Sequence, residues 1–471
     1  MAQSRNLISG RGKTVMLTLL ALMAALAAGC GGNGQGTQTR TVIVGPPEEQ
    51  GDANSSQPAI SADGRFVAFT SESTNLGRSA TLGRNVFIKD VESGATTLVS
   101  ASEAGTEGNG DSEQPAISAD GRFVAFASDA SDLVAADGND TCLNAVGANI
   151  NCRDVFLKDT QTGGVKLVSA DGAGNQAEGT SRQPAISADG RFIAFVSDAP
   201  NLAPGDGNGE TDVFLKDMSS GALQQVSANP EGSAGNGRSA LPAISADGRY
   251  VAFSSLAEDL VENDANGKTD VFIRDTQTGA LALVSTDAAG AQGNRASGFD
   301  ALAISADGRF VVFESEADNL VEGDANGKRD VFLKDTQTGA VTLVSTDAAG
   351  AQGEDDSFMS VAVSRDGRTV FFSSNANNLA PGDVASKSDI FRKDVSAGTV
   401  DILSTDSAGA FGDGSSECLA ATPDGALVAF SSSAANLAPG DANGKDDIFL
   451  KDLRTGETVI VSTSSRPEET G

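Results

Sequence analysis

The residues with the clearest chemical potential are aspartates and asparagines that recur in four short polar segments. Each segment reads Asp-x-Asn-Gly-x-x-Asp, so oxygen-bearing side chains stand at positions 1, 3 and 7 around a glycine. This spacing resembles the start of a calcium-binding loop, because calcium prefers carboxylate and amide oxygens. The candidate ligands are Asp206, Asn208, Asp212, Asp264, Asn266, Asp270, Asp324, Asn326, Asp330, Asp441, Asn443 and Asp447.

These segments differ from an EF-hand, although an acidic residue such as Asp275 also stands at position 12. Positions 8–12 read as a strand, and five strand residues span about 16 Å, so Asp275 cannot reach the same ion. Asp, Asn and Gly also form turns, and the segments can equally be plain polar loops. Calcium is therefore the one cofactor that the sequence suggests, with an ordinary acidic loop as the alternative.

Composition excludes several other chemistries. The chain of 471 residues has no histidine, which removes imidazole as a base, proton carrier or metal ligand. The formal net charge is −31, which argues against nucleic-acid binding and against docking on anionic lipid. The carboxylates repeat at equivalent positions in most units, which indicates architecture, whereas catalytic residues would be unique to one or two units. We therefore expect no catalytic residues and no enzyme activity.

The N-terminal residues read as an export signal. Arg5, Arg11 and Lys13 precede a mostly apolar stretch, residues 15–28, that is too short for a comfortable membrane span. Ala27-Ala28-Gly29-Cys30 resembles a bacterial lipobox, which implies that residues 1–29 are removed and that Cys30 is lipidated. The alternative is an ordinary secretory signal. Residues 30–40 are then a Gly-rich tether, and the lipid is the only membrane contact.

Three further cysteines remain in the exported protein. Cys142 and Cys152 bracket an inserted loop with nine residues between them, and an oxidising compartment permits a disulfide there. Cys418 is expected to be a free, buried thiol.

The rest of the chain is a tandem repeat. The phrase Pro-Ala-Ile-Ser-Ala-Asp-Gly-Arg-Phe-Val-Ala-Phe begins at Pro58 and returns in varied form, with its Asp-Gly pair 57 to 69 residues further on each time. The seven Asp-Gly pairs begin at Asp63, Asp120, Asp189, Asp247, Asp307, Asp366 and Asp424. Seven similar units therefore fill residues 41–465, followed by a short tail, 466–471.

Each unit reads as four strands. In the third unit these are residues 183–187, 191–197, 212–216 and 222–227, and Asp189-Gly190 forms a hairpin turn between the first two. The second and third strands are apolar on successive positions, so both of their faces must be covered. A four-stranded antiparallel meander that is covered on both faces and repeated around a ring is a β-propeller. The sequence predicts an all-β fold, a seven-bladed β-propeller.

The repeat resembles a known family. Ser-Ala-Asp-Gly-Arg-Phe-Val-Ala-Phe, and above all Thr422-Pro423-Asp424-Gly425, is similar to the WD40-like repeat of TolB-type propellers, also called PD40. The resemblance covers all seven units and implies the fold, but propellers host many activities. Only ten residues separate Cys30 from Thr41, which leaves no room for the N-terminal domain of TolB. An eighth outer-strand segment, Thr41-Val42-Ile43-Val44, is expected to cover the seam where the ring closes.

In such a meander the long loops share one end of the ring. The connections between second and third strands and those between units are long, whereas the other turns are short. Binding usually occurs on long loops held by a rigid scaffold. All but three of the 22 phenylalanines fall in the second and third strands; the exceptions are Phe299, Phe358 and Phe411, which we expect in loops on this face. They are candidate partner-binding residues, or alternatively they plug the mouth of the channel.

Three functions remain open on the sequence alone. We expect a monomeric, exported bacterial lipoprotein of the outer membrane or cell surface that binds a protein or glycan partner through its long-loop face. The alternatives are a carboxylate- or metal-dependent hydrolase or lyase that acts on an extracellular polymer, and a purely structural envelope protein.

Overall fold

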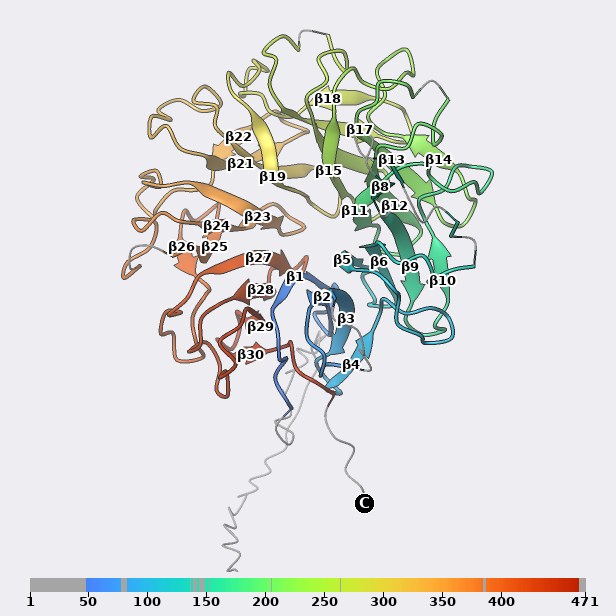
Figure 1. Cartoon of the computed structure of the whole chain (residues 1–471). Helices are drawn as coiled ribbons and strands as arrows, with labels where there is room; N and C mark the ends of the chain where they lie inside the picture. Colours follow the sequence, from blue (N-terminus) through green and yellow to red (C-terminus); the bar gives the residue numbers. More distant parts are fainter. Residues whose placement is uncertain are drawn as a thin grey trace, which may run out of the picture. The chain divides into compact units, whose positions relative to one another are not determined.

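The chain folds into seven four-stranded antiparallel sheets, one for each sequence repeat (Figure 1). The computed structural model describes residues 48–77, 83–135, 137–138, 142–143, 149–150, 152–204, 206–262, 264–383 and 387–465, all within the compact unit Ile43–Gly471. The sheets are arranged as the blades of a seven-bladed β-propeller, which confirms the predicted fold. The predicted signal, tether and tail, with Cys30, lie outside the described residues.

Each blade is numbered in chain order and uses one inner strand, two central strands and one outer strand. The inner strands are β1 (Ser55–Ile60), β5 (Ser112–Ile117), β11 (Ser181–Ile186), β15 (Ser239–Ile244), β19 (Ser297–Ile304), β23 (Ser357–Val363) and β27 (Ser416–Ala421). The second strands are β2 (Phe66–Ser71), β6 (Phe123–Ser128), β12 (Phe192–Ser197), β16 (Tyr250–Ser255), β20 (Phe310–Ser315), β24 (Thr369–Ser374) and β28 (Leu427–Ser432).

The third strands are β3 (Asn85–Asp90), β9 (Asp154–Asp159), β13 (Asp212–Asp217), β17 (Asp270–Asp275), β21 (Asp330–Asp335), β25 (Asp389–Asp394) and β29 (Asp447–Asp452). The outer strands are β4 (Ala95–Leu98), β10 (Val165–Leu167), β14 (Leu223–Gln225), β18 (Leu281–Leu283), β22 (Val341–Leu343), β26 (Val400–Ile402) and β30 (Thr458–Ile460). A small hairpin, β7 (Cys142–Leu143) and β8 (Asn149–Ile150), lies in the insertion of blade 2. No helix among the described residues is long and apolar enough to cross a membrane.

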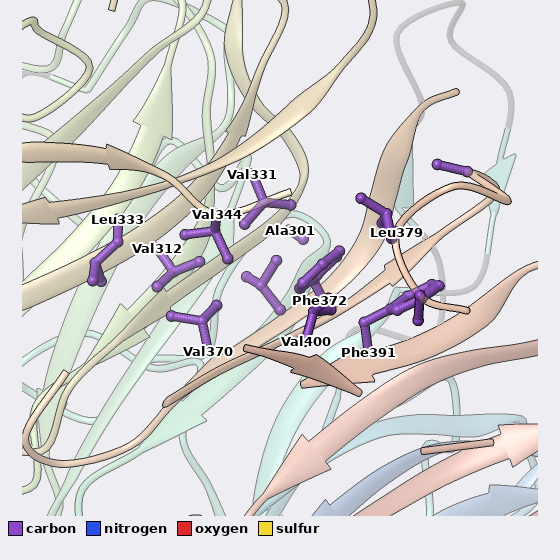
Figure 2. Close-up of a cluster of buried hydrophobic side chains, with 13 residues drawn as sticks. Ala301, Val312, Val331, Leu333, Val344, Val370, Phe372, Leu379, Phe391 and Val400 are labelled. Atoms are coloured by element: carbon purple, nitrogen blue, oxygen red, sulfur yellow. The ribbon is translucent and has the colours of Figure 1, made fainter. Parts of the chain in front are cut away.

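The core lies between neighbouring blades. The second and third strands of each blade are buried on both faces, as their unbroken apolar runs require. They pair a phenylalanine with a phenylalanine in every blade, with ring centroids between 5.5 and 6.0 Å apart. Figure 2 shows how side chains of blades 5 and 6, among them Val312, Val331 and Phe372, meet in one such layer.

The Asp-Gly turns form as predicted. Asp189 accepts hydrogen bonds from Ser187 Oγ at 2.7 Å and from the Arg191 backbone at 3.0 Å. Gly190 adopts a φ of 74°, and a Cβ there would lie 2.4 Å from the Phe123 ring of the preceding blade. Glycine is therefore required twice, for the turn and for the close approach of two blades.

The outer strands are shorter than the sequence suggests. In blade 3 we expected residues 222–227, but β14 ends at Gln225. Ser227 leaves the strand because its Oγ donates a hydrogen bond to Asp212 at 2.6 Å, on the third strand. The equivalent serine–aspartate bond recurs in blades 2, 4, 5, 6 and 7.

The ring closes through a loop. Blade 7 is completed by β30, and the first described residues run alongside the segment after it, as the bridge between Gln50 and Thr463 shows. Ser464 N–H donates to Glu49 O at 2.8 Å and Gly51 N–H donates to Ser462 O at 2.9 Å. Residues 49–51 thus take the place of the loop that elsewhere joins two blades. The segment 41–44, expected to cover this seam, lies outside the described residues.

A buried cation joins each blade to the one before it. Lys334 on β21 donates to Thr286 O at 2.9 Å and to Asp287 O at 2.8 Å, just beyond the outer strand of blade 4. The equivalent buried residues are Lys89, Lys158, Lys216, Arg274, Lys334, Lys393 and Lys451. At the seam, Lys89 of blade 1 donates to Ser464 O at 3.0 Å and so joins blade 1 to blade 7.

We predict that Lys334→Met destabilises the propeller by about 2–3 kcal/mol, because two carbonyl oxygens lose a charged donor in a buried seam. Lys334→Arg should retain most of the stability, since blade 4 uses Arg274 at the same position and reaches Val226 O at 3.0 Å. Urea unfolding of the two variants and the parent protein measures the difference. Equal losses from Met and Arg would contradict a hydrogen-bonding role.

Candidate functional site

The acidic loop of blade 4 forms a closed hydrogen-bond network. Gln292, from the loop after β18, places its Nε2 between two carboxylates, donating to Asp264 Oδ1 at 2.7 Å and to Asp270 Oδ2 at 2.8 Å. Asn266 Nδ2 also donates to Asp270 Oδ2 at 2.8 Å. The Asn266 side-chain oxygen accepts the Lys268 backbone N–H at 2.7 Å. Predicted ligand positions 1, 3 and 7 therefore do come together, around an amide.

The same arrangement recurs around the ring with informative substitutions. Equivalent bridges are made by Gln176 between Asp137 and Asp154 and by Gln50 between Asp441 and Asp447. In blade 5, Gln352 bonds to the first aspartate of the loop, Asp324, at 3.2 Å. In blade 1 the pair is reversed: Asn85 Nδ2 donates to Glu107 Oε1 at 2.8 Å. An aspartate with a glutamine partner is thus replaced by an asparagine with a glutamate partner, which preserves the hydrogen bond. This glutamine was not recognised in the sequence, although it recurs at a fixed place after the outer strand.

These hydrogen bonds are relevant to calcium binding, because they use the oxygen atoms that would be its ligands. The carboxylate and amide oxygens of blades 4 and 5 face N–H donors, and among the described residues no three acidic or cysteine side chains converge as a metal centre. The residues do not fit the ion as arranged, because a cation would first have to displace the glutamine amide. Burial raises the pKa of Asp270, Asp330 and Asp447 to about 6. Calcium binding stays a prediction.

Blade 3 departs from this pattern. Ala234 takes the place of the bridging glutamine, as its bridge with Ala228 shows. Asp212 still accepts hydrogen bonds from Ser227 and, at 3.3 Å, from Asn208. Burial, with a smaller effect of the Asp212 charge, raises the pKa of Asp206 to about 6. Of the four predicted loops, this one lacks the bridging amide.

If calcium binds, it should raise the melting temperature well beyond sodium at matched ionic strength, because only a specifically bound ion stabilises the folded form by mass action. Asp206→Asn should reduce the gain most, since among the described residues no glutamine joins Asp206 to Asp212 in blade 3, where the Gln225 side chain interacts with Asp212 alone. Asp264→Asn, Asp324→Asn and Asp441→Asn should reduce it less. Differential scanning calorimetry of the four variants measures these gains. Equal shifts from the two salts would mean that the loops are ordinary acidic turns.

The structure corrects the positions of two phenylalanines. Phe299 and Phe358, expected in loops, lie in the inner strands β19 and β23. These strands carry the widest bulges: the register of β19 jumps from Ser297 opposite Ser315 to Leu302 opposite Phe313. Extra residues inside a strand have no separate signal in the hydrophobic pattern, so the bulge reads as a loop.

One arginine connects the two phenylalanines. The Arg329 guanidinium lies 5.7 Å from the centroid of the Phe299 ring and 5.0 Å from that of Phe358. It also pairs with Asp300 at 2.8 Å. Blades 5 and 6 therefore share a cluster of aromatic and charged side chains that the other blades do not repeat among the described residues.

A buried carboxyl group lies beneath this cluster. Glu314 on β20 is fully buried, and its Oε1 accepts N–H bonds from Asp300 and Ala301 in the wide bulge. Its Oε2 has no hydrogen-bond partner and lies 4.0 Å from Arg329 Nη1. Burial, with a smaller effect of the Asp300 charge, raises the pKa of Glu314 to about 7. Glu314 was not singled out in the sequence. The signal that could have found it is an acidic residue within the apolar run Phe-Val-Val-Phe-Glu-Ser.

We predict that Glu314→Gln stabilises the protein at pH 8 and leaves it unchanged near pH 4.5. A carboxyl group whose pKa rises on folding stabilises the folded state fully below its unfolded pKa, and this contribution is lost as the pH rises through 7. The rise from 4.5 to about 7 corresponds to at most about 3 kcal/mol. Urea unfolding across this pH range measures it. Glu316→Gln, an exposed residue next to the same strand, is the control; identical pH profiles for the two variants would contradict the prediction.

The third phenylalanine stands apart from this cluster. Phe411 occupies the position of the bridging glutamine in blade 6, as its bridge with Thr405 shows. Its ring lies over Gly382, where an added Cβ would come within 3.0 Å. Among the described residues no ring contact joins it to Phe299 or Phe358.

The cysteines follow the expected division where they are described. Cys152 is buried and disulfide-bonded. Cys418 on β27 is a free thiol as predicted, but it is half-buried and not fully buried. Burial raises the pKa of the Cys418 thiol. The side chain of Cys142 lies outside the described part, so its pairing with Cys152 remains a prediction.

A second unrepeated cluster lies between blades 1 and 2. Arg84 and Arg153 both bond to the buried Glu113 on β5. Arg153 also contacts Asp129 at 2.8 Å, and Arg84 lies 3.3 Å from Asp111. Each charged group has at least one partner of opposite charge, so the cluster reads as a structural ion-pair network.

Comparison with solved structures places the fold. No protein-family model and no curated protein sequence matches the chain. The β-propeller domain of the Trilobed protease from Pyrococcus furiosus matches 90% of this chain and 100% of its own, at 13% identity and a TM-score of 0.53. An oligogalacturonate lyase in complex with manganese matches 85% of this chain and 91% of its own, at 15% identity and a TM-score of 0.51.

A prolyl endopeptidase matches 88% of this chain at 13% identity and a TM-score of 0.53, and this chain spans about half of its length. TolB from Acinetobacter baumannii matches 75% of this chain and 82% of its own, with 16% identity and a TM-score of 0.38. At such identities the likeness concerns the fold alone. The class is thus a seven-bladed β-propeller of the architecture found in peptidase propeller domains, and the TolB resemblance rests on the repeat sequence.

Proposed function

We propose that this protein is a non-enzymatic binding scaffold that holds a protein or glycan partner on its long-loop face. One observation carries the proposal: the described residues expose three large hydrophobic side chains, and all three belong to consecutive blades. Leu256, Phe299 and Met359 are 38%, 37% and 37% exposed. Each lies at the end of its blade where the long loops meet the inner strand. An exposed apolar group with a polar surround is typical of an interaction site.

The charged groups around these side chains favour binding of a partner over catalysis. Asp300, half exposed, is held by Arg329, while Glu314 is sealed from solvent and cannot touch a substrate. These two carboxyl groups therefore do not form an acid–base pair around a reacting bond. The net charge of −31 disfavours nucleic acid and acidic polymers as partners.

Anchoring belongs to the same proposal. The short apolar N-terminal stretch and the Ala-Ala-Gly-Cys sequence support export and lipidation at Cys30, with the propeller on the outer membrane or cell surface. A Gly-rich tether of residues 30–40 would let the ring orient toward a partner.

The experiment introduces the photo-crosslinking residue p-benzoylphenylalanine at Phe299 in cells that make the protein. Irradiation should give a heavier adduct in the membrane fraction, and in the soluble fraction for the Cys30→Ala variant. The same residue at Gln277, on an exposed short turn at the other end of blade 4, is the control and should give none. Purified protein should leave oligogalacturonate and peptide substrates unchanged, with or without manganese. Equal adducts at both positions, or turnover of either substrate, would contradict the proposal.

A further inference from the structure

The inner strands line a cavity of about 350 Å³ in the central channel of the ring. At one level its wall is formed by the equivalent residue of blade after blade, among them Gln57, Gln114 and Gln183 from blades 1 to 3. The opposite wall includes Asp300, Met359 and Ser360 from blades 5 and 6. This volume is in the range of small-molecule sites, about 300–1,000 Å³.

The backbone is strained at this level. The six non-glycine residues with positive φ among the described residues are Gln57, Gln114, Gln183, Leu241, Met359 and Cys418, with φ between 44° and 71°. All six line the cavity. Such conformations are unfavourable by about 1–3 kcal/mol each and cluster at ligand sites.

The strain gives the glutamines a defined orientation. Gln114 N–H donates to Gln57 Oε1 at 3.0 Å, and Gln183 N–H donates to Gln114 Oε1 at 2.9 Å. Leu241 N–H continues the series to Gln183 Oε1 at 3.2 Å. Each carboxamide oxygen is therefore used by the next blade, and the NH₂ end of the same side chain is left over.

These three NH₂ groups form an arc of donors along one side of the channel. Among the described residues none of them donates a hydrogen bond, and none belongs to the buried, unpartnered atoms, so they are open to the cavity. Packing does not demand them, because blade 4 has Leu241 and blade 6 has Met359 at the same position. An arc of N–H donors suits a ligand rich in oxygen acceptors.

The other side of the cavity supplies acceptors and an apolar surface. Asp300 pairs with Arg329 at 2.8 Å and is half exposed. Met359 and the neighbouring Phe299 present exposed apolar surface. A ligand must therefore accept hydrogen bonds on one side, donate them on the other, and carry an apolar face.

We propose that the central channel binds a neutral saccharide, a mono- or disaccharide or the end of a longer glycan. Sugar hydroxyls both accept from the glutamine amides and donate to Asp300, and the C–H face of the ring lies against Met359. An anion would meet the Asp300 carboxylate, and an apolar ligand would leave the amide donors unpaired. This inference rests on the proposed function and names the ligand class for the channel.

The test uses saturation-transfer difference NMR and isothermal titration calorimetry with a panel of neutral disaccharides at millimolar concentration. The panel is maltose, cellobiose, trehalose and N,N′-diacetylchitobiose, with digalacturonate as the acidic comparison. At least one neutral sugar should bind, and digalacturonate should not. Binding of digalacturonate alone, or of no neutral sugar, overturns the proposal.

The decisive variant is Gln114→Glu, which keeps the oxygen that accepts the Gln183 N–H and removes the NH₂ donor. It should weaken binding about tenfold or more, the value of one or two hydrogen bonds, while the melting temperature stays near that of the parent. Gln277→Glu, an exposed short-turn position with the same charge change, should bind normally. Unchanged affinity in Gln114→Glu overturns the channel site. Crosslinking at position 299 reports the partner surface independently, and cleavage of a bound sugar would contradict the non-enzymatic function while leaving the site.

Discussion

The buried cation at the seam between blades is the contact on which the ring depends. Each outer strand is followed by carbonyl oxygens that its own blade cannot satisfy, and the third strand of the next blade supplies the ammonium or guanidinium group. Lys216 reaches Ala170 O and Asp171 O at 2.8 Å each, and Lys451 reaches Thr405 O at 3.0 Å. A blade without its successor would leave these acceptors to water, and a blade without its predecessor would leave its cation without its carbonyl partners. Closure removes both ends at once. Glu48 completes the seam by pairing with Lys89 at 2.6 Å.

In the acidic loops, too, a neighbouring segment of the chain provides the hydrogen-bond donor. The Gln292 amide bonds to Asp264 and Asp270, the first and last aspartates of the acidic loop. Because Gln292 lies in the loop after β18, these bonds tie that loop to the acidic loop between the second and third strands. Blade 1 shows that the hydrogen bond is what the position preserves, because Asn85 and Glu107 exchange donor and acceptor roles. Raised pKa values follow from burial of these carboxylates, and Asp447 at the seam behaves like Asp270 in mid-ring.

The sequence predicts the architecture because the pattern of one blade occurs seven times in the chain. Period, Asp-Gly turns and paired phenylalanines together determine blade number and the central strands. The hydrophobic pattern predicts strand ends less well where a side chain bonds to a neighbouring strand. Ser227 lies beyond the end of β14 and bonds to Asp212, and no hydrophobic pattern encodes this hydrogen bond. Phe299 and Phe358 were placed in loops because wide bulges break the alternation on which strand assignment relies. The seam lysines were readable as a recurring cation in an apolar strand. Their carbonyl partners in the neighbouring blade lie 45 to 57 residues away, or 374 and 375 residues away for Lys89, and only the fold brings them near.

Because the seams between all blades contribute to the stability of the ring, single blades can differ from the repeat in sequence. The departures are concentrated: blade 5 has Glu314 where other second strands have small or apolar residues, and the widest register jumps lie in β19 and β23. Blades 1 to 3 share a glutamine that the other blades lack at this position, so the channel is lined by a row of donors on one side and by different groups on the other. Repetition alone would give a ring with the same chemistry on every side. The difference between its two halves gives the channel a direction, and a ligand that contacts both halves has one orientation in which every polar group is paired.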